Sequence, residues 1–342
     1  MAVYTTIDDP EAYFQTVIYT GNGSADHAIT LPGDTDMQPD LVWIKNRDAA
    51  DAHCLYDAVR GVTKHIQSND TSGEATDTDT LDAFQSDGFK LDGDNEVNTN
   101  AEKYVAFNWK AAGSTASNST GDLTSTVSAN TTSKFSIVSW TAADAGAAKT
   151  IGHGLGVVPE FIIVKQRNRT INWICYIEAI NNTNTMWLDT TDASSDVNYW
   201  NDTSPTTSLF TTNGVLEDAY NNIAYCFASV QGFSKFGSYT GNGNADGTFV
   251  YTGFKPAFVM LKSTASATNW QIMDNKRNTF NPVDKNVRAD TANAEEDFDI
   301  IDMLSNGFKL RYTSDSNVSG NTIIYMAFAE APFVNSNGVP CN

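Results

Sequence analysis

The hydrophobic positions of this chain fall in short runs, and one run occurs three times in nearly the same form. Each copy has a proline, one intervening residue, four apolar residues and then a lysine; the copies occupy residues 39–47, 159–167 and 256–264. Four consecutive apolar residues rich in β-branched and aromatic side chains predict a strand buried on both faces. Proline is tolerated at the first residue of a strand, so it indicates where each strand begins.

Other landmarks recur in the same order around these runs. Tyr-Thr-Gly-Asn-Gly occurs at 19–23 and again at 239–243, and an Asn-Trp pair at 172–173 recurs at 269–270, with His53 in the equivalent place of the first copy. Aromatic segments that begin at Tyr104, Tyr225 and Tyr325 close the copies. Such recurrence predicts an internal repeat of about one hundred residues, so Lys45, Lys165 and Lys262 should lie in equivalent environments.

Short alternating segments bounded by Gly, Asn and Asp predict an all-β fold. We expect three tandem antiparallel β-sandwich units of jelly-roll-like form, each with its own core. The expected parts are an N-terminal arm at 1–12, units at 13–110, 134–234 and 235–333, a Ser/Thr/Gly linker at 111–133 and a polar tail at 334–342. The long linker predicts a loosely tethered first unit, whereas the second and third should pack together.

The charge balance narrows the possible partners. The chain has 342 residues, 41 of them acidic and 21 basic, giving a formal net charge of −20. Nucleic-acid binding needs clustered Lys and Arg, which we do not find. No apolar run reaches the roughly 18 residues of a membrane span, and the first residues lack the pattern of a secretory signal. The four cysteines show no Cys-x-x-Cys spacing, so we expect free thiols.

Catalytic motifs are missing from the sequence. The four histidines share no metal-ligand spacing, and no Gly-x-Ser-x-Gly or Walker motif occurs. A glycosidase needs two carboxylates facing each other across a cleft, which sequence alone does not reveal. We therefore expect no enzymatic activity and no cofactor, and we keep a polysaccharide-degrading enzyme as the alternative.

Two polar loops are candidate binding sites. Asp92 and Asp94 lie in a turn dense in oxygen ligands, which is typical of Ca²⁺ loops but also of ordinary solvated turns. Tyr199 and Trp200 lie in a polar loop at about 181–208, where exposed aromatic rings would stack on a glycan. The alternative is that both rings fold back beneath the loop as a small satellite core.

The repeated motifs resemble a repeat module found in virion proteins of marine tailed phages. The similarity rests on Thr-Gly-Asn-Gly, Pro-Asp-Leu-Val-Trp-Ile-Lys-Asn-Arg, Ser-Asp-Gly-Phe and Tyr-Val-Ala-Phe-Asn-Trp-Lys in the first copy. The most specific match is Ile-Gly-His-Gly-Leu-Gly-Val-Val-Pro-Glu-Phe-Ile-Ile-Val-Lys-Gln-Arg at 151–167, and the likeness covers most of residues 13–333. The third copy departs from the pattern, because Ser263 and Thr264 replace the Asn-Arg pair.

This resemblance implies a non-enzymatic structural protein located in the virion, most simply a tail fibre or another surface appendage. It implies assembly as a homo-oligomer, contacts with other virion proteins, and loops that attach to a host-surface glycan. A capsid decoration protein or an adhesin-like binding protein would carry the same features. The resemblance transfers no catalytic residue to this chain.

Overall fold

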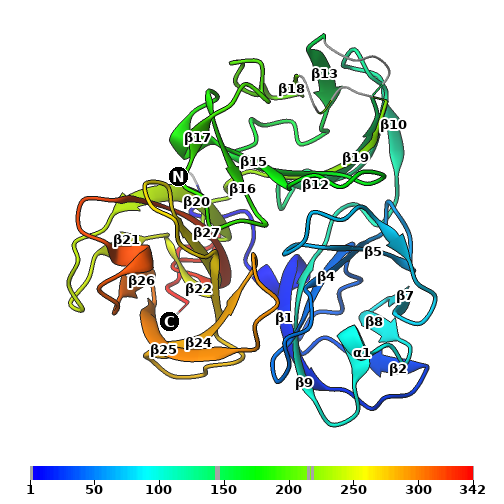
Figure 1. Cartoon of the computed structure of the whole chain (residues 1–342). Coiled ribbons are helices and arrows are strands. Elements are labelled where there is room, and N and C mark those ends of the chain that lie inside the picture. The colour runs from blue at the N-terminus through cyan, green and yellow to red at the C-terminus, as the bar shows by residue number, and fades with distance from the viewer. Residues whose placement is uncertain (1–2, 143–146, 214–215, 217–218, 342) are drawn as a thin grey trace.

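The computed structural model describes residues 3–142, 147–213, 216 and 219–341, and the fold they form is all-β, with antiparallel sheets. Figure 1 shows three lobes around a common centre, coloured from blue to cyan, in green, and from yellow to red. We call them the first lobe (β1 to β9), the second lobe (β10 to β19) and the third lobe (β20 to β27). The all-β prediction is thus confirmed.

The first lobe consists of two sheets with an apolar core between them. The larger sheet has the order β1 (Phe14–Thr20), β9 (Lys103–Trp109), β3 (Leu41–Asn46), β4 (Cys54–Asp57), β5 (Lys64–Gln67), β6 (Ala75–Thr76). The smaller sheet has the order β2 (His27–Ile29), β8 (Gly88–Leu91), β7 (Leu81–Gln85). The one-turn helix α1 (Asn95–Asn98) leads into β9, and the 3₁₀ turn η1 (Pro10–Ala12) leads into β1.

The second lobe also combines a large sheet with a small one. The large sheet has the order β10 (Ala116–Asn118), β11 (Ser125–Asn130), β12 (Phe135–Thr141), β19 (Asn221–Phe227), β14 (Phe161–Gln166), β15 (Ile174–Ile177), β16 (Asn184–Trp187), β17 (Ser195–Asp196). The small sheet pairs β13 (Lys149–Gly152) with β18 (Leu209–Thr212), and η2 (Glu178–Ile180) follows β15. Trp140, Ile151 and Phe210 belong to the core of this lobe.

The third lobe is one sheet that curls around its core into a nearly closed barrel. Its order is β20 (Ser234–Thr240), β27 (Thr322–Pro332), β22 (Phe254–Ser263), β23 (Gln271–Asp274), β24 (Val283–Arg288), β25 (Glu296–Leu304), β26 (Gly307–Leu310), β21 (Phe249–Tyr251). The turn η4 (Asp315–Asn317) precedes β27. No helix within the described ranges is long and apolar enough to cross a membrane.

The three large sheets share one strand order at their centres. It reads β1-β9-β3-β4-β5 in the first lobe, β12-β19-β14-β15-β16 in the second and β20-β27-β22-β23-β24 in the third. The three Pro-x-apolar runs lie in β3, β14 and β22, and their apolar residues are buried in all three strands. The strand predictions made from these runs are therefore confirmed.

One hydrophobic cluster contains residues of all three lobes. At its centre, the ring of Phe14 stacks on that of Phe328 at 4.9 Å between centroids, and Trp109 lies 5.8 Å from Phe258 and 6.3 Å from Phe227. The expectation of wholly separate cores is thus corrected: each lobe has a core of its own, and a common core joins the lobes.

Strand alternation explains how one run serves both cores. Successive side chains of a strand point to opposite faces. In β3, Leu41 and Trp43 belong to the common core, whereas Val42 and Ile44 belong to the core of the first lobe. The corresponding residues of β14 and β22 divide in the same way.

The segment 111–133 is not a free linker, because β10 and β11 extend the large sheet of the second lobe. Backbone hydrogen bonds to β12 hold it, and such pairing does not require apolar side chains. The first lobe is not loosely tethered either, since it contributes to the common core. The N-terminal arm and the tail are also bound: the Tyr4 hydroxyl donates to Gly253 O at 2.8 Å, and Ser336 N donates to Asp8.

Candidate functional site

The two aspartates predicted to bind Ca²⁺ accept hydrogen bonds from backbone N–H groups. The Asp94 carboxylate caps α1 by accepting from Glu96 N at 2.7 Å, and burial raises its pKa. Asp92 Oδ1 accepts from Asp26 N at 3.1 Å. Within the described part of the chain, no group of three or more His, Cys, Asp and Glu residues is placed to hold a metal ion. The structure therefore places both carboxylates as turn-stabilising acceptors.

The aromatic pair predicted to stack on a glycan lies largely inside the second lobe. Trp200 is only 1% exposed, its indole Nε1 donates to Thr185 Oγ1 at 3.1 Å, and its ring packs edge-on against Tyr176. Tyr199 is half-buried against the same core. The stacking interpretation required an exposed ring, which Trp200 does not provide. Its placement matches the alternative, a satellite core beneath the loop.

The three lysines of the repeated run occupy buried cradles of carbonyl oxygens. Lys165 Nζ donates to Ile171 O at 2.5 Å and, across a lobe boundary, to Thr71 O at 2.8 Å. Lys262 Nζ donates to Thr268 O at 2.7 Å and to Thr191 O of the second lobe at 2.8 Å.

Lys45 is buried in the same way, but both of its acceptors lie in the first lobe. Its Nζ donates to Asn46 O at 2.6 Å and to Ala49 O at 3.1 Å. Burial lowers the pKa of all three ammonium groups to about 8. Because all three side chains are enclosed, they hold backbone segments together rather than face a ligand.

The residues beside these lysines connect the lobes in a ring. Trp173 Nε1 of the second lobe donates to Gln67 O of the first at 2.8 Å, and Trp270 Nε1 of the third lobe donates to Trp187 O of the second at 2.9 Å. His53 closes the ring, because its Nε2 lies 2.9 Å from Arg288 O of the third lobe. The Asn-Trp recurrence identified these positions, but their partners lie on other lobes and left no local signal.

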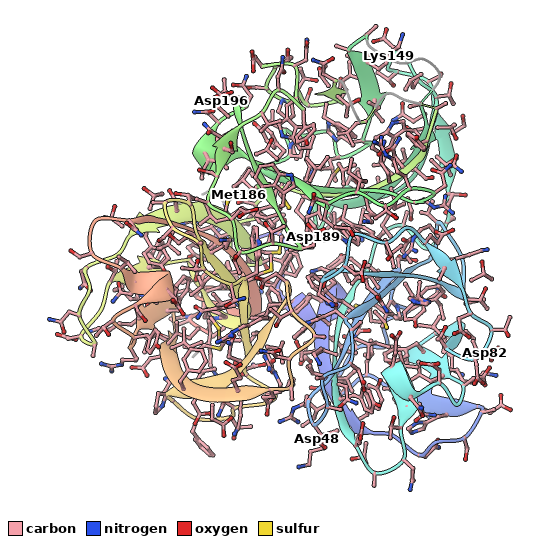
Figure 2. The ribbon with its side chains drawn as sticks, viewed as in Figure 1. Asp48, Asp82, Lys149, Met186, Asp189 and Asp196 are labelled. Atoms are coloured by element: carbon pink, nitrogen blue, oxygen red, sulfur yellow. The ribbon has the colours of Figure 1, made fainter. Side chains whose placement is uncertain are left out.

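The side chains at the centre of the molecule and those at its outer surface differ in polarity. Figure 2 shows Met186 and Asp189 near the junction of the lobes, whereas Asp48, Asp82 and Asp196 lie toward the outside. Met186 is fully buried in the common core, and burial raises the pKa of Asp189 to about 6. The acidic surface therefore surrounds a largely apolar centre.

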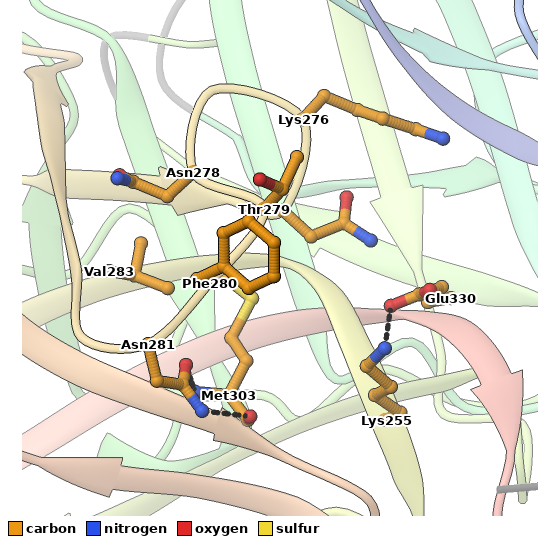
Figure 3. A pocket seen from close by; sticks show the side chains of 10 residues that line it. Lys255, Lys276, Asn278, Thr279, Phe280, Asn281, Val283, Met303 and Glu330 are labelled. Atoms are coloured by element: carbon orange, nitrogen blue, oxygen red, sulfur yellow. Dashed lines mark hydrogen bonds and ion pairs between the residues drawn. The ribbon is translucent and has the colours of Figure 1, made fainter.

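A hollow in the third lobe lies beside an exposed aromatic ring. It measures ≈ 410 Å³ and lies beside the connection between β23 and β24, whose Phe280 is 84% exposed (Figure 3). An ion pair between Lys255 Nζ and Glu330 Oε2 at 2.8 Å lines one side. We did not predict this hollow from the sequence; the signal that could have revealed it is the length of this connection.

The fold and these contacts define a class: an all-β protein of three lobes around a common core. The chain belongs to the family described as "Domain of unknown function (DUF7483)", which matches residues 9–332. Neither a curated protein nor a solved structure matches it.

Proposed function

We propose that this chain is a non-enzymatic structural protein of a tailed-phage virion, in a tail fibre or another surface appendage. One observation carries the proposal: the repeated lysines are enclosed in cradles, two of which join neighbouring lobes. Lysines enclosed in this way stabilise the fold and are not accessible to a substrate. These same motifs resemble the virion repeat module.

We further infer that the chain consists of three tandem β-sandwich repeats of jelly-roll-like form. The shared strand order of the large sheets supports this inference, as do the equivalent places of Lys45, Lys165 and Lys262. In the proposed role, the ring of lobes is a rigid support whose outer loops meet a host-surface glycan or neighbouring virion proteins. Assembly into a homo-oligomer would multiply weak contacts with the host surface.

The location can be tested with purified phage particles. Particles are banded on a density gradient and analysed by quantitative mass spectrometry, with the major capsid protein as the positive control and a replication protein as the negative control. We expect this chain in the particle band at a fixed copy number relative to the capsid protein. Its presence in the lysate but not in the particle band would contradict the proposal.

A further inference from the structure

The connection between β23 and β24 breaks the likeness among the lobes. It comprises residues 275–282, whereas the equivalent connections comprise 58–63 in the first lobe and 178–183 in the second, so the third is two residues longer. The first and third connections begin alike: Asp57 Oδ1 accepts from Arg60 N, and Asp274 Oδ1 accepts from Arg277 N, both at 2.8 Å. The equivalent strands of the other two lobes are joined without the two extra residues, which in the third lobe accompany the exposed Phe280.

The longer connection is held rigidly on both sides of Phe280. Asn278 Oδ1 accepts from Lys285 N at 2.7 Å, and its Nδ2 donates to Asp284 Oδ1 at 2.8 Å. Asn281 Nδ2 donates to Met303 O, and Asn281 Oδ1 accepts from Met303 N, both at 2.8 Å. These bonds hold the segments on both sides of Phe280, whose ring is 84% exposed. Because the connection is already ordered by these bonds, its backbone loses little conformational freedom when a ligand binds to Phe280.

The hollow beside this ring combines apolar and polar groups. Its volume of ≈ 410 Å³ falls within the range of roughly 300–1,000 Å³ of ligand pockets. Asn275 also lines the hollow, although its Oδ1 is buried and has no hydrogen-bond partner among the described residues. The Lys255–Glu330 pair adds further donors and acceptors while its two charges offset each other. Figure 3 shows the Phe280 ring on one side of the view and the Lys255–Glu330 ion pair on the other.

We propose that this hollow binds an uncharged sugar ring, an assignment that rests on the proposed role in attachment to a host glycan. The apolar face of the sugar stacks on Phe280, as sugars do on exposed aromatic rings. Its hydroxyl groups exchange hydrogen bonds with the half-exposed Lys255–Glu330 pair. Lys255 and Glu330 offset each other, and the second cation of the lining, Lys276, lies 3.9 Å from Glu11 Oε1. With its charges offset in this way, the hollow favours a neutral sugar over a carboxylated one, which would also meet the −20 net charge of the chain.

The test uses the full chain and a panel of neutral oligosaccharides built from glucose, galactose and mannose, with sialylated and uronic-acid oligosaccharides beside them. Binding is measured on a glycan array and then by titration with ligand-observed NMR. We expect binding of at least one neutral oligosaccharide, an affinity loss of about tenfold or more in Phe280→Ala, and retained binding in Phe280→Trp. Phe249→Ala, at a 45% exposed ring of the same lobe, is the matched control and should bind as the wild type does.

Three outcomes would overturn the assignment: no binding to any neutral sugar, binding only to acidic sugars, or neutral binding that Phe280→Ala leaves unchanged. Because Phe280 is exposed, its replacement should leave the melting temperature within about 1 °C of the wild type, which separates lost binding from lost folding. The particle analysis remains independent, so a virion protein that fails these binding tests disproves the site alone. Sugar binding by a chain that is absent from particles disproves the virion role alone.

Discussion

At the scale of single residues, the three copies use different side chains for an equivalent hydrogen bond between lobes. In the second and third lobes a tryptophan donates its indole N–H to the preceding lobe, whereas the first lobe uses His53. The Trp43 ring lies edge-on to His53 and donates its Nε1–H to His53 Nδ1 at 2.9 Å. Since Nδ1 accepts, Nε2 carries the proton and donates to Arg288 O. Burial holds the pKa of His53 well below its usual value, so the ring stays neutral.

Replacing His53 by phenylalanine should destabilise the protein by about 2–4 kcal/mol, because both Trp43 Nε1 and Arg288 O lose their partner in a buried place. Urea unfolding measures the loss. His65→Phe is the control: His65 Nδ1 has no hydrogen-bond partner among the described residues, and its replacement should cost less than half as much. Equal losses in the two variants would argue against the role of His53.

The buried lysines lead to a prediction about pH. The pKa of Lys262 is about 8 in the folded chain and 10.5 when unperturbed. Below pH 8 both states hold the proton and the cost of burying it is present in full. Between pH 8 and 10.5 the unfolded chain holds more protons than the folded one, so this group's contribution to the unfolding free energy rises with pH.

Comparing wild type with Lys262→Met isolates that contribution, because buried Tyr and Cys groups titrate in both proteins. The unfolding free energy of the wild type relative to the variant should increase from pH 7.5 to pH 9.5. Urea unfolding at the two pH values measures the difference. Parallel pH dependence would contradict a lowered pKa for Lys262, and Lys165→Met offers a second variant in an equivalent cradle.

At the scale of elements, the recurring Gly-Asn-Gly turn is explained by the segment it contacts. Asn98 Oδ1 accepts from Asn22 N at 2.8 Å in the first lobe, and Asn317 Oδ1 accepts from Asn242 N at 3.1 Å in the third. In both lobes the accepting asparagine, Asn98 or Asn317, lies shortly before the last strand of the large sheet, β9 or β27. The turn and that strand entrance therefore form one unit, which is why both recur.

The first glycine of the turn is required by space. A Cβ at Gly241 would lie 2.3 Å from Val318 O, which is backbone and does not move aside. We expect Gly241→Ala to cost about 2 kcal/mol or more. Gly320→Ala is the matched control, because Gly320 has φ +81° but nothing within 4 Å, so its cost should stay near 1 kcal/mol. A Gly241→Ala cost no larger than that of the control would refute the steric argument.

At the scale of the whole molecule, three boundaries repeat one backbone contact. Glu74 N donates to Arg167 O, Ser194 N to Thr264 O at 3.0 Å, and Glu295 N to Arg47 O at 2.9 Å. Two boundaries add a bidentate ion pair: Arg47 with Glu295 and Arg167 with Glu74.

The third copy has Thr264 in place of that arginine, and the residue that faces it on the second lobe differs as well. Ser194 stands where the other boundaries have a glutamate, and its Oγ donates to Thr264 O at 3.0 Å. The replacement of the Asn-Arg pair by Ser263 and Thr264 is thus matched on the facing lobe by the replacement of the glutamate with Ser194.

Because the lobes share a common core, we expect a substitution in that core to destabilise all three lobes. Phe328→Ala should cost about 3–5 kcal/mol and lower the hydrogen-exchange protection of strands in every lobe, because its ring contacts Phe14 of the first lobe, Phe227 of the second and Phe258 of the third. Phe308→Ala removes a ring from the third lobe's own core, so its effect should be largest there. Protection lost only in the third lobe for both variants would contradict a common core.

The sequence by itself determined what local pattern encodes: the all-β class, the three buried Pro-initiated strands and the tight turns, because apolar runs and glycine conformations act over a few residues. It also showed that β3, β14 and β22 are buried on both faces. Only the tertiary structure decided that one of those faces meets the other lobes, that 111–133 pairs with β12, that Trp200 points inward and that the hollow lies beside Phe280. Each of these depends on contacts with residues far away in the sequence, and the spacing of residues within a short segment does not specify such contacts.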